Sequence, residues 1–264
     1  MTLKQFVAEY SYLIDQENFR ELFNQASKKI SKQDRIKLTK LIVDAELNPA
    51  VGLEKLPPNF LEESNITVFD VPEGVVSIGS NAFSYCGELV LIHLPSSLRN
   101  SYLGSFYECN KLKDVYFNGS LEDWCKINFT YPSSHPLFNA NIGKKVNLYV
   151  NNILLANKLV VPSTISIIKQ YAFQHCEELT ELVLPRNITE LGECSFSWCS
   201  GLTSVHIKNK DIVLSNGCFY NVDTIDIFFD GTKAEWKQVY NPRAFEHTYF
   251  TVNCTDGKIV KKKK

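Results

Sequence analysis

The chain has 264 residues, of which 44% are hydrophobic and 22% charged, and 28 basic residues against 29 acidic ones leave a formal net charge of −1. This length and composition predict one elongated domain with a small helical one beside it. The balanced charge and the lack of any RNA- or DNA-binding signature argue against a nucleic-acid partner, and no apolar run reaches the length of a membrane span.

Residues 1–50 are predicted to form a small helical unit. Apolar residues recur at helical spacing from Leu3 to Ala26 and again from Ile36 to Leu47, and Asn48-Pro49 ends the second helix. Two roles stay open for this unit: a cap for the open end of a repeat array, or a docking domain that attaches the array to something larger. The first residues lack the basic start and unbroken apolar stretch of a signal peptide, so we expect a cytoplasmic or virion-associated protein.

Residues 51–264 carry a repeat with a period of 23. Phenylalanine recurs at this spacing, and the residue six places after each phenylalanine is Ile or Leu. The phenylalanines are Phe60, Phe83, Phe106, Phe173, Phe196 and Phe219, and the residues that follow them are Ile66, Leu89, Leu112, Leu179, Leu202 and Ile225. A fixed period of this length is typical of a stack of coils, in which each unit buries its apolar side against its neighbours.

Each unit is predicted to contain three short elements. Apolar residues at spacings of three, as in residues 82–89, indicate one or two turns of α- or 3₁₀-helix. A strand that ends at proline follows, as in residues 89–95. A second extended piece, as in residues 75–79, ends in a glycine that we expect to take a tight bend, Gly79 here and Gly192 in a later unit.

The chain also repeats itself on a larger scale. Residues 117–124 return 112 positions later as residues 229–236, and the pair His135 and Phe138 returns as His247 and Phe250. We therefore expect two related halves, about 56–157 and 158–264, each closed by one tryptophan-bearing module.

Each module is predicted to begin a short helix with a capping box. Ser120 with Asp123, and Thr232 with Glu235, have the spacing at which a hydroxyl caps the first turn while the carboxylate bonds back. Each such helix is expected to bury one tryptophan, because that side chain covers a large apolar area.

At this level of detail the residues resemble a known family. The pattern Leu-x-x-(Val/Ile/Leu)-x-(Ile/Leu)-Pro, then Ile/Leu-Gly and Ala-Phe-x-x-Cys, is similar to the BspA-type leucine-rich repeats of bacterial surface proteins, some protists and some phage genomes, over about residues 56–264. The resemblance implies a right-handed leucine-rich-repeat solenoid with a parallel sheet on its concave side. With the 23-residue period and the helical pattern of residues 1–50, the expected fold class is α/β: a β-rich solenoid of 23-residue coils with a small N-terminal helical cap. Members are mostly adhesive or binding proteins. The last unit departs from the pattern, with residues 208–210 in place of the proline and Val222 in place of the cysteine.

The cysteines are interpreted as packing residues rather than ligands or nucleophiles. Cys86, Cys109, Cys176 and Cys199 share one column three residues after the phenylalanine, where Val222 can replace them. No C-x-x-C spacing suggests zinc, and free thiols are expected. No catalytic or cofactor-binding motif is present, and the neighbours His175 and Cys176 do not make a catalytic pair, so we expect no enzyme, no cofactor and no metal.

The candidate binding site is the concave sheet. Side chains one, two and four positions after the repeat leucine should point away from the core, and strands lie about 4.8 Å apart, so they form two ladders. The first ladder is Asp70, His93 and Tyr116, and the second is Val183, His206 and Phe228. Aromatic and imidazole side chains suit a protein partner of unknown identity. Ser84 and Gln174 are expected to be exposed on the convex side.

Two functions follow from these expectations. The first is a non-enzymatic leucine-rich-repeat module that binds a protein with its concave sheet. The alternative is a structural or assembly component, for example of a phage virion, that attaches through residues 1–50. A segment at residues 125–157 is also able to cover part of the sheet, and the lysines at 261–264 are expected to form a solvated tail.

Overall fold

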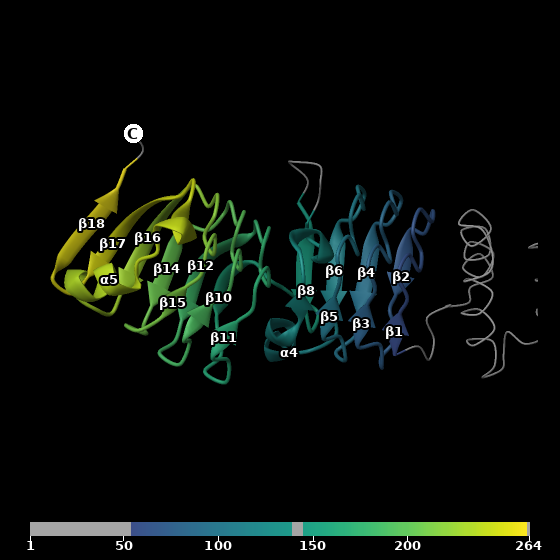
Figure 1. Ribbon diagram of the computed structural model, residues 1–264, viewed down its shortest axis with the longest axis horizontal. Helices are drawn as coiled ribbons and strands as arrows, with labels where there is room; N and C mark the ends of the chain where they lie inside the picture. Colours follow the sequence, from purple (N-terminus) through teal and green to yellow (C-terminus); the bar gives the residue numbers. More distant parts are fainter. Residues whose placement is uncertain (1–53, 139–144, 263–264) are drawn as a thin grey trace, which may run out of the picture.

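The computed structural model describes residues 54–138 and 145–262, which form an elongated, β-rich stack of coils (Figure 1). One coil runs from a short strand through a turn to a long strand, and the next coil lies beside it. The predicted helical unit of residues 1–50 lies outside the described residues, as do Lys263 and Lys264.

The long strands form two separate sheets. The first sheet contains β2 (Val68–Asp70), β4 (Leu91–Leu94), β6 (Asp114–Phe117), β8 (Asn147–Val150) and β9 (Ile153–Leu154), in that order. The second contains β10 (Asn157–Val160), β12 (Leu179–Leu184), β14 (Ser204–Ile207), β16 (Thr224–Phe229), β17 (Tyr249–Cys254) and β18 (Gly257–Lys261). All neighbours are parallel except the pairs β8–β9 and β17–β18, which are antiparallel.

Short strands line the opposite side of the coils. They are β1 (Lys55–Leu56), β3 (Ser77–Ile78), β5 (Asn100–Ser101) and β7 (Asn128–Phe129) in the first half, and β11 (Ile167–Ile168), β13 (Glu190–Leu191) and β15 (Val213–Leu214) in the second. The helical elements in the described residues are α4 (Leu121–Lys126), α5 (Lys233–Val239) and the 3₁₀ turns η2 (Pro132–Ser134) and η3 (Pro242–Phe245).

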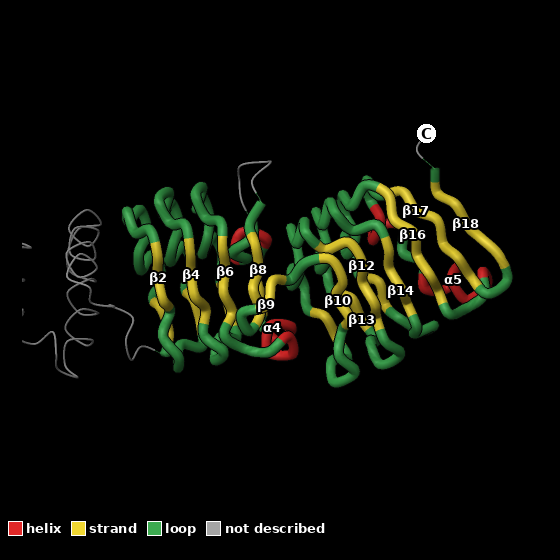
Figure 2. The backbone as a smooth tube through the Cα atoms, turned by 180° about the vertical axis from the view of Figure 1, so that it is seen from behind, coloured by secondary structure: helices red, strands yellow, loops and turns green. Residues whose placement is uncertain are grey.

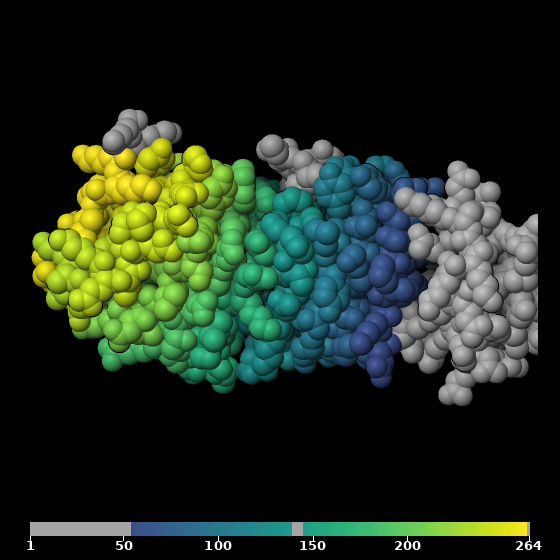
Figure 3. Space-filling view, in the orientation of Figure 1, coloured from purple at the N-terminus to yellow at the C-terminus, as the bar shows by residue number. Residues whose placement is uncertain are grey.

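The single parallel sheet that the family resemblance implies is divided in two. The break lies between β9 and β10, where the first long-strand sheet ends in an antiparallel hairpin (Figure 2). The reversal of β9 turns the chain away from the parallel direction, so β10 starts a new sheet rather than extending the first one. Side chains close this break on the face shown in Figure 3.

The phenylalanine column is confirmed as the centre of the core. Phe83 stacks on Phe106 with ring centroids 5.5 Å apart, and Phe173, Phe196 and Phe219 stack in turn at 5.2 and 5.9 Å. All five rings are at most 1% exposed. The column of Ile and Leu six places later is buried as well, so each coil contributes two side chains to a continuous apolar stack.

The first coil departs from the predicted register. Cys109 Sγ donates to the carbonyl oxygen of Phe83 at 3.1 Å, and one coil earlier Cys86 Sγ makes the same bond with Leu61, not Phe60. Leu61 therefore occupies the place of the phenylalanine. Phe60 is buried, but its ring meets Phe69 edge-on at 6.3 Å. The first coil has one residue fewer between this position and Ile66, which the spacing of the phenylalanines concealed.

The predicted helical turns after each phenylalanine are hydrogen-bonded turns and not helices. The amide of Cys86 donates to the carbonyl of Phe83 at 3.1 Å, which is the spacing of a 3₁₀ turn. The backbone between them breaks the helix, because Tyr85 has a φ of 58°. His175 has the same φ in the equivalent turn, so the interruption belongs to the repeat.

The repeat glycines serve close approach rather than a tight bend. Gly192 has an ordinary φ, but a Cβ there would lie 2.5 Å from the amide nitrogen of Gln170 and 2.8 Å from the carbonyl carbon of Lys169. Gly79 is equally close to the backbone of Pro57 and Pro58. A side chain at either position would push neighbouring coils apart.

Both modules form as predicted. Ser120 and Asp123 make a capping box at α4, Thr232 and Glu235 make another at α5, and each helix buries its tryptophan. The Ser120 hydroxyl holds the pKa of Asp123 below its usual range.

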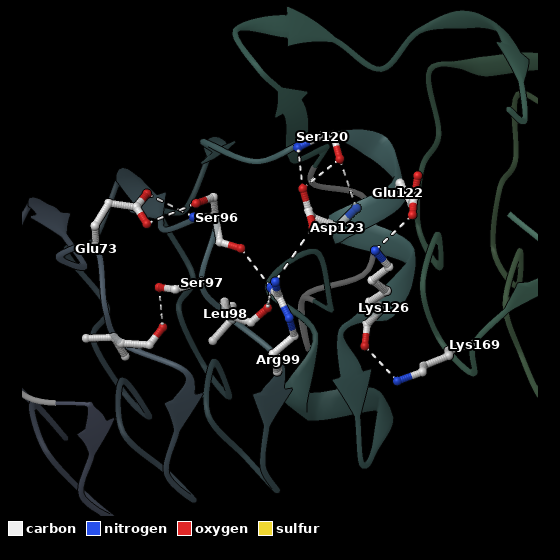
Figure 4. A network of polar contacts seen from close by, with 11 residues as sticks. Glu73, Ser96, Ser97, Leu98, Arg99, Ser120, Glu122, Asp123, Lys126 and Lys169 are labelled. Carbon is white, nitrogen blue, oxygen red and sulfur yellow. Dashed lines mark hydrogen bonds and ion pairs between the residues drawn. The ribbon is translucent and has the colours of Figure 1, made fainter. Parts of the chain in front are cut away.

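The first module joins the two halves. Trp124 Nε1 donates to the carbonyl of Ala172 at 2.7 Å, and Gln174 Nε2 donates to the carbonyl of Pro132 at 2.7 Å. A chain of polar contacts runs through the same place: Arg99 lies 3.6 Å from Asp123 on α4, and Lys169 donates to the carbonyl of Lys126 (Figure 4). The second half therefore packs against the tryptophan module that closes the first half.

Two predictions about single residues are wrong. Ser84 and Gln174 are each 2% exposed, because the residue after the phenylalanine points toward the neighbouring coil. His135 and His247 are not equivalent: His135 is buried and His247 is exposed. Trp124 meets the ring of His135 edge-on, whereas Trp236 meets the rings of Tyr240, Phe245 and Phe250.

Candidate functional site

The long strands present one face to solvent. In β4, β6, β8 and β14 exposure alternates along the strand, with every second residue buried. This alternation follows from the pleat of a strand whose one face covers the core. The outward side chains of both long-strand sheets are called the long-strand face below.

The first predicted ladder is aligned on this face. Asp70 pairs with His93 and His93 with Tyr116 in the register of β2, β4 and β6. His93 Nδ1 contacts the Asp70 carboxylate, and its ring lies 5.0 Å from that of Tyr116. Tyr149 on β8 extends the ladder, since its ring stacks on Tyr116 at 4.3 Å with an interplanar angle of 5°. The result is a carboxylate, an imidazole and two phenol rings in one line.

The second predicted ladder is aligned in the second sheet. Val183, His206 and Phe228 share one register across β12, β14 and β16, and the ring of His206 stacks on that of Phe228 at 4.6 Å. The carboxylate comes from a different position than in the first half: Glu181 Oε1 lies 3.5 Å from His206 Nε2. Lys158 lies 2.7 Å from the same oxygen.

Both halves thus present the same arrangement. A carboxylate on the preceding coil contacts a histidine, and an aromatic ring on the following coil covers that histidine. The side chains of His93 and His206 are each 36% exposed, so they are held in place and still reach solvent. We call these two groups the acid–histidine–aromatic clusters.

Sequence reasoning missed two members of these clusters. Glu181 was on the outward side of its strand, but only the structure brings it to His206 from the neighbouring column. Tyr149 lies in the segment that was expected to cover the sheet. Residues 147–150 instead form β8 and extend the sheet, so the ladder gains a ring. The available signal was Tyr149 itself, an aromatic residue directly after Asn147 and Leu148 in an extended segment. The 23-residue period did not reveal it, because this segment lies outside the period.

The described part of the chain also has a groove away from the ladders. A shallow groove of about 560 Å³ runs along β11, β13 and β15, lined by Ile167, Glu190, Val213 and other residues, on the side opposite to the ladders. No group of three or more His, Cys, Asp or Glu side chains is placed to hold a metal ion among residues 54–138 and 145–262. Within the same ranges no helix is both long and apolar enough for a membrane span.

The cysteines lie where the repeat predicted them. Cys86, Cys109, Cys176 and Cys199 are buried free thiols. Burial raises the pKa of Cys86 to about 11 and that of Cys199 to about 12. Burial also raises the pKa of Cys176, so this thiol stays protonated beside His175 at neutral pH.

Comparison with known proteins gives one family and several distant structures. The family described as BspA type Leucine rich repeat region matches residues 54–153 and 140–248, in six copies. No curated protein matches the chain.

Solved leucine-rich repeat proteins are similar at low identity. TpLRR of T. pallidum is 19% identical, with 65% of this chain and 62% of that protein covered and a TM-score of 0.29. A leucine-rich repeat protein of Bacteroides ovatus is 16% identical, with coverage of 76% and 69% and a TM-score of 0.36. The pneumococcal vaccine antigen PcpA is 16% identical, with coverage of 80% and 72% and a TM-score of 0.36. The chain thus spans less than two thirds of TpLRR.

Proposed function

Because this chain belongs to the BspA-type leucine-rich repeat family, we propose that it is a non-enzymatic module that binds another protein through its long-strand face. In this proposal the coils form a right-handed solenoid with that face on its concave side, and residues 1–50 cap the open end. The module is cytoplasmic or virion-associated.

The observation that carries the proposal is the presence of both acid–histidine–aromatic clusters. The two halves reach the same arrangement with different residues, since the carboxylate is Asp70 in one and Glu181 in the other. A core requirement does not explain this, because the side chains point out of the stack. Aromatic and imidazole groups that are fixed by neighbours and still exposed are favoured at protein interfaces, where they contribute large contact area at low cost in side-chain entropy.

The shape of the site favours a macromolecule over a small ligand. Small-molecule sites are concave and enclose most of the ligand. The clusters lie on the outward faces of two sheets, and the groove along β11, β13 and β15 is on the other side of the coils. In this proposal a partner protein contacts both clusters at once.

A quantitative capture experiment tests the proposal. The parent chain, immobilised, is exposed to an extract of its native host, and the proteins retained are identified by mass spectrometry. The leading partner is then purified and titrated against the parent and two double variants, His93→Ala with Tyr116→Ala and His206→Ala with Phe228→Ala. We expect each double variant to bind about thirtyfold more weakly or worse, since loss of a hot spot costs at least about 2 kcal/mol.

The matched control replaces two exposed rings elsewhere. Tyr85 and Tyr107 are 51% and 36% exposed and contact each other at 5.5 Å in the turns of the first half. Tyr85→Ala with Tyr107→Ala should leave partner binding unchanged. If both cluster variants bind like the parent and removal of residues 1–50 abolishes binding, the protein is instead a structural or assembly component, for example of a phage virion, that attaches through its N-terminal segment.

A further inference from the structure

A second line of aromatic rings runs along the turns of the chain, away from the two clusters. It crosses the junction and the second half, and its consecutive ring centroids are 5.9, 5.7, 6.0 and 5.4 Å apart. Its members are Phe138, His175, Trp198, Tyr220 and His247. The turns connect each short strand to the following long strand, so this turn-edge row lies along an edge between the two kinds of sheet.

The row is accessible to solvent. Trp198 is 39% exposed, whereas the other two tryptophans, Trp124 and Trp236, are at most 2% exposed. His247 is exposed, and His175 and Tyr220 are half-buried. Several members touch each other as well as solvent, so the row is a continuous surface rather than a set of isolated side chains.

The backbone under the row would prefer other residues. His175 and Trp198, both two positions after the repeat phenylalanine, have φ values of 58° and 61°. Bulky residues rarely adopt this left-handed region, which glycine and asparagine tolerate best. The next coil has Asn221 at the same position, with a φ of 55°. Tyr85 and Glu108 have the same conformation at the equivalent positions of the first half, with φ values of 58° and 59°, so the repeat imposes it whatever the side chain. The fold therefore accepts asparagine here, and the backbone does not require the ring of Trp198.

The surroundings of the row are acidic. The segments 171–178, 193–200, 217–223 and 243–247 contain five carboxylates and one basic residue, whereas the whole chain is nearly balanced. The carboxylates are Glu177, Glu178, Glu193, Asp223 and Glu246, and the basic residue is Arg243. Two lysines from other segments also lie there: Lys145 lies 2.8 Å from Glu178 and neutralises it, and Lys261 Nζ donates to the carbonyl oxygen of Phe245 at 2.8 Å. The five carboxylates still outnumber the three basic residues. Burial holds the pKa of His175 at about 4, so its ring adds no positive charge at neutral pH.

We propose that the turn-edge row binds an arginine-rich segment of a partner protein. The planar guanidinium stacks on aromatic faces and pairs with carboxylates, and these are the two kinds of group that the row offers side by side. Lysine offers a point charge without a plane, so arginine is preferred. This surface is separate from the long-strand face. The proposal for the turn-edge row therefore does not depend on the function proposed for that face.

Fluorescence anisotropy with labelled peptides tests the proposal on the full chain. The probes are peptides of eight arginines, eight lysines and eight glutamates. We expect the arginine peptide to bind at least fivefold more tightly than the lysine peptide, and the glutamate peptide not to bind. Binding of the arginine peptide should also change the emission of Trp198, the exposed tryptophan.

Substitutions assign this binding to the row. Trp198→Asn removes the ring in favour of a residue that the backbone conformation suits, so the fold is retained, as thermal unfolding followed by circular dichroism will check. Trp198→Asn should weaken binding of the arginine peptide at least tenfold, and Glu177→Gln should weaken this binding severalfold. Trp198→Phe should stay within about threefold of the parent, and Phe228→Ala, on the long-strand face, should have no effect. The proposal is overturned if the arginine peptide does not bind, or if Trp198→Asn binds it like the parent, which would indicate non-specific attraction to carboxylates.

Discussion

The phenylalanine column is the clearest case in which one residue per coil stabilises the fold. Phe196 is fully buried between Phe173 and Phe219, with ring centroids 5.2 and 5.9 Å away. A ring in this position fills the space between coils on both sides, so its loss leaves a void that neither neighbour can close.

Phe196→Ala should therefore lower the free energy of unfolding by about 3–5 kcal/mol. Urea denaturation followed by circular dichroism measures this as a shift of the midpoint at constant slope. Phe228→Ala, which removes an exposed ring, is the control and should change stability by less than about 1 kcal/mol. An unchanged midpoint for Phe196→Ala would mean that the coils are stacked in another register.

His135 shows how a buried residue makes stability depend on pH. Its Nδ1 accepts a hydrogen bond from the amide of Leu137 at 3.2 Å, which leaves the proton on Nε2, 3.2 Å from the carbonyl oxygen of Ala172. Burial lowers the pKa of His135 from 6.5 to about 3. The folded pKa is below the unfolded one, so the neutral ring stabilises the fold above pH 6.5, and this contribution is lost as the pH falls toward 3.

Between pH 7 and pH 4 the parent should lose about 3 kcal/mol of stability through His135. His175, whose pKa burial lowers to about 4, acts in the same direction. His135→Phe isolates the first effect, because it keeps a planar ring in the buried site and removes the group that titrates. The urea midpoint is measured at pH 7, 5.5 and 4. As the pH is lowered, it should fall less for His135→Phe than for the parent. An equal fall in the two proteins would show that His135 is not buried as a neutral ring.

At the scale of one coil, backbone contact sets which residues are allowed. The sequence placed Gly192 at a bend, but its φ is ordinary, and the neighbouring coil at Lys169 and Gln170 occupies the space where a Cβ would be. Gly87 also has an ordinary φ, but a Cβ added there would have no atom within 4 Å apart from those of its chain neighbours. Neither glycine is in the left-handed region, so the difference that matters is in their tertiary surroundings.

This contrast gives a matched pair of substitutions. Gly192→Ala should destabilise the protein by about 1–3 kcal/mol, because the backbone of the adjacent coil must move. Gly87→Ala should be neutral or stabilising by up to about 1 kcal/mol, through reduced freedom of the unfolded chain. Thermal and urea unfolding of both variants measure the difference. Similar effects at the two positions would contradict the close approach at Gly192.

At the scale of the whole molecule, the first tryptophan module couples the two halves. Trp124 lies in the first half and donates to Ala172 in the second, and Gln174 and Lys169 bond back to the module. In a stack of repeats the stability of each part depends on its contacts with its neighbours. The junction is therefore the place where cooperativity between the halves is most vulnerable.

Trp124→Ala should separate the unfolding of the two halves. The remaining tryptophans, Trp198 and Trp236, are both in the second half, so their fluorescence reports that half alone, while circular dichroism reports both. The two signals should share one midpoint in the parent and diverge in Trp124→Ala. Trp236→Ala, at the far end of the chain, should lower stability without separating the signals, and coincident transitions in Trp124→Ala would show that other contacts couple the halves.

The sequence by itself determined the repeat, the family, the buried columns, the capping boxes and the outward ladders on the long strands. These features depend on spacing within one coil or on a constant step between coils, and both are visible in the order of residues. The structure alone decided the register of the first coil at Leu61, the burial of Ser84 and Gln174, the division of the sheet between β9 and β10, and the contacts of Glu181 and Tyr149. Each of these results from a local change in length, or from side chains that meet only after two coils are stacked, so no period in the sequence could indicate them.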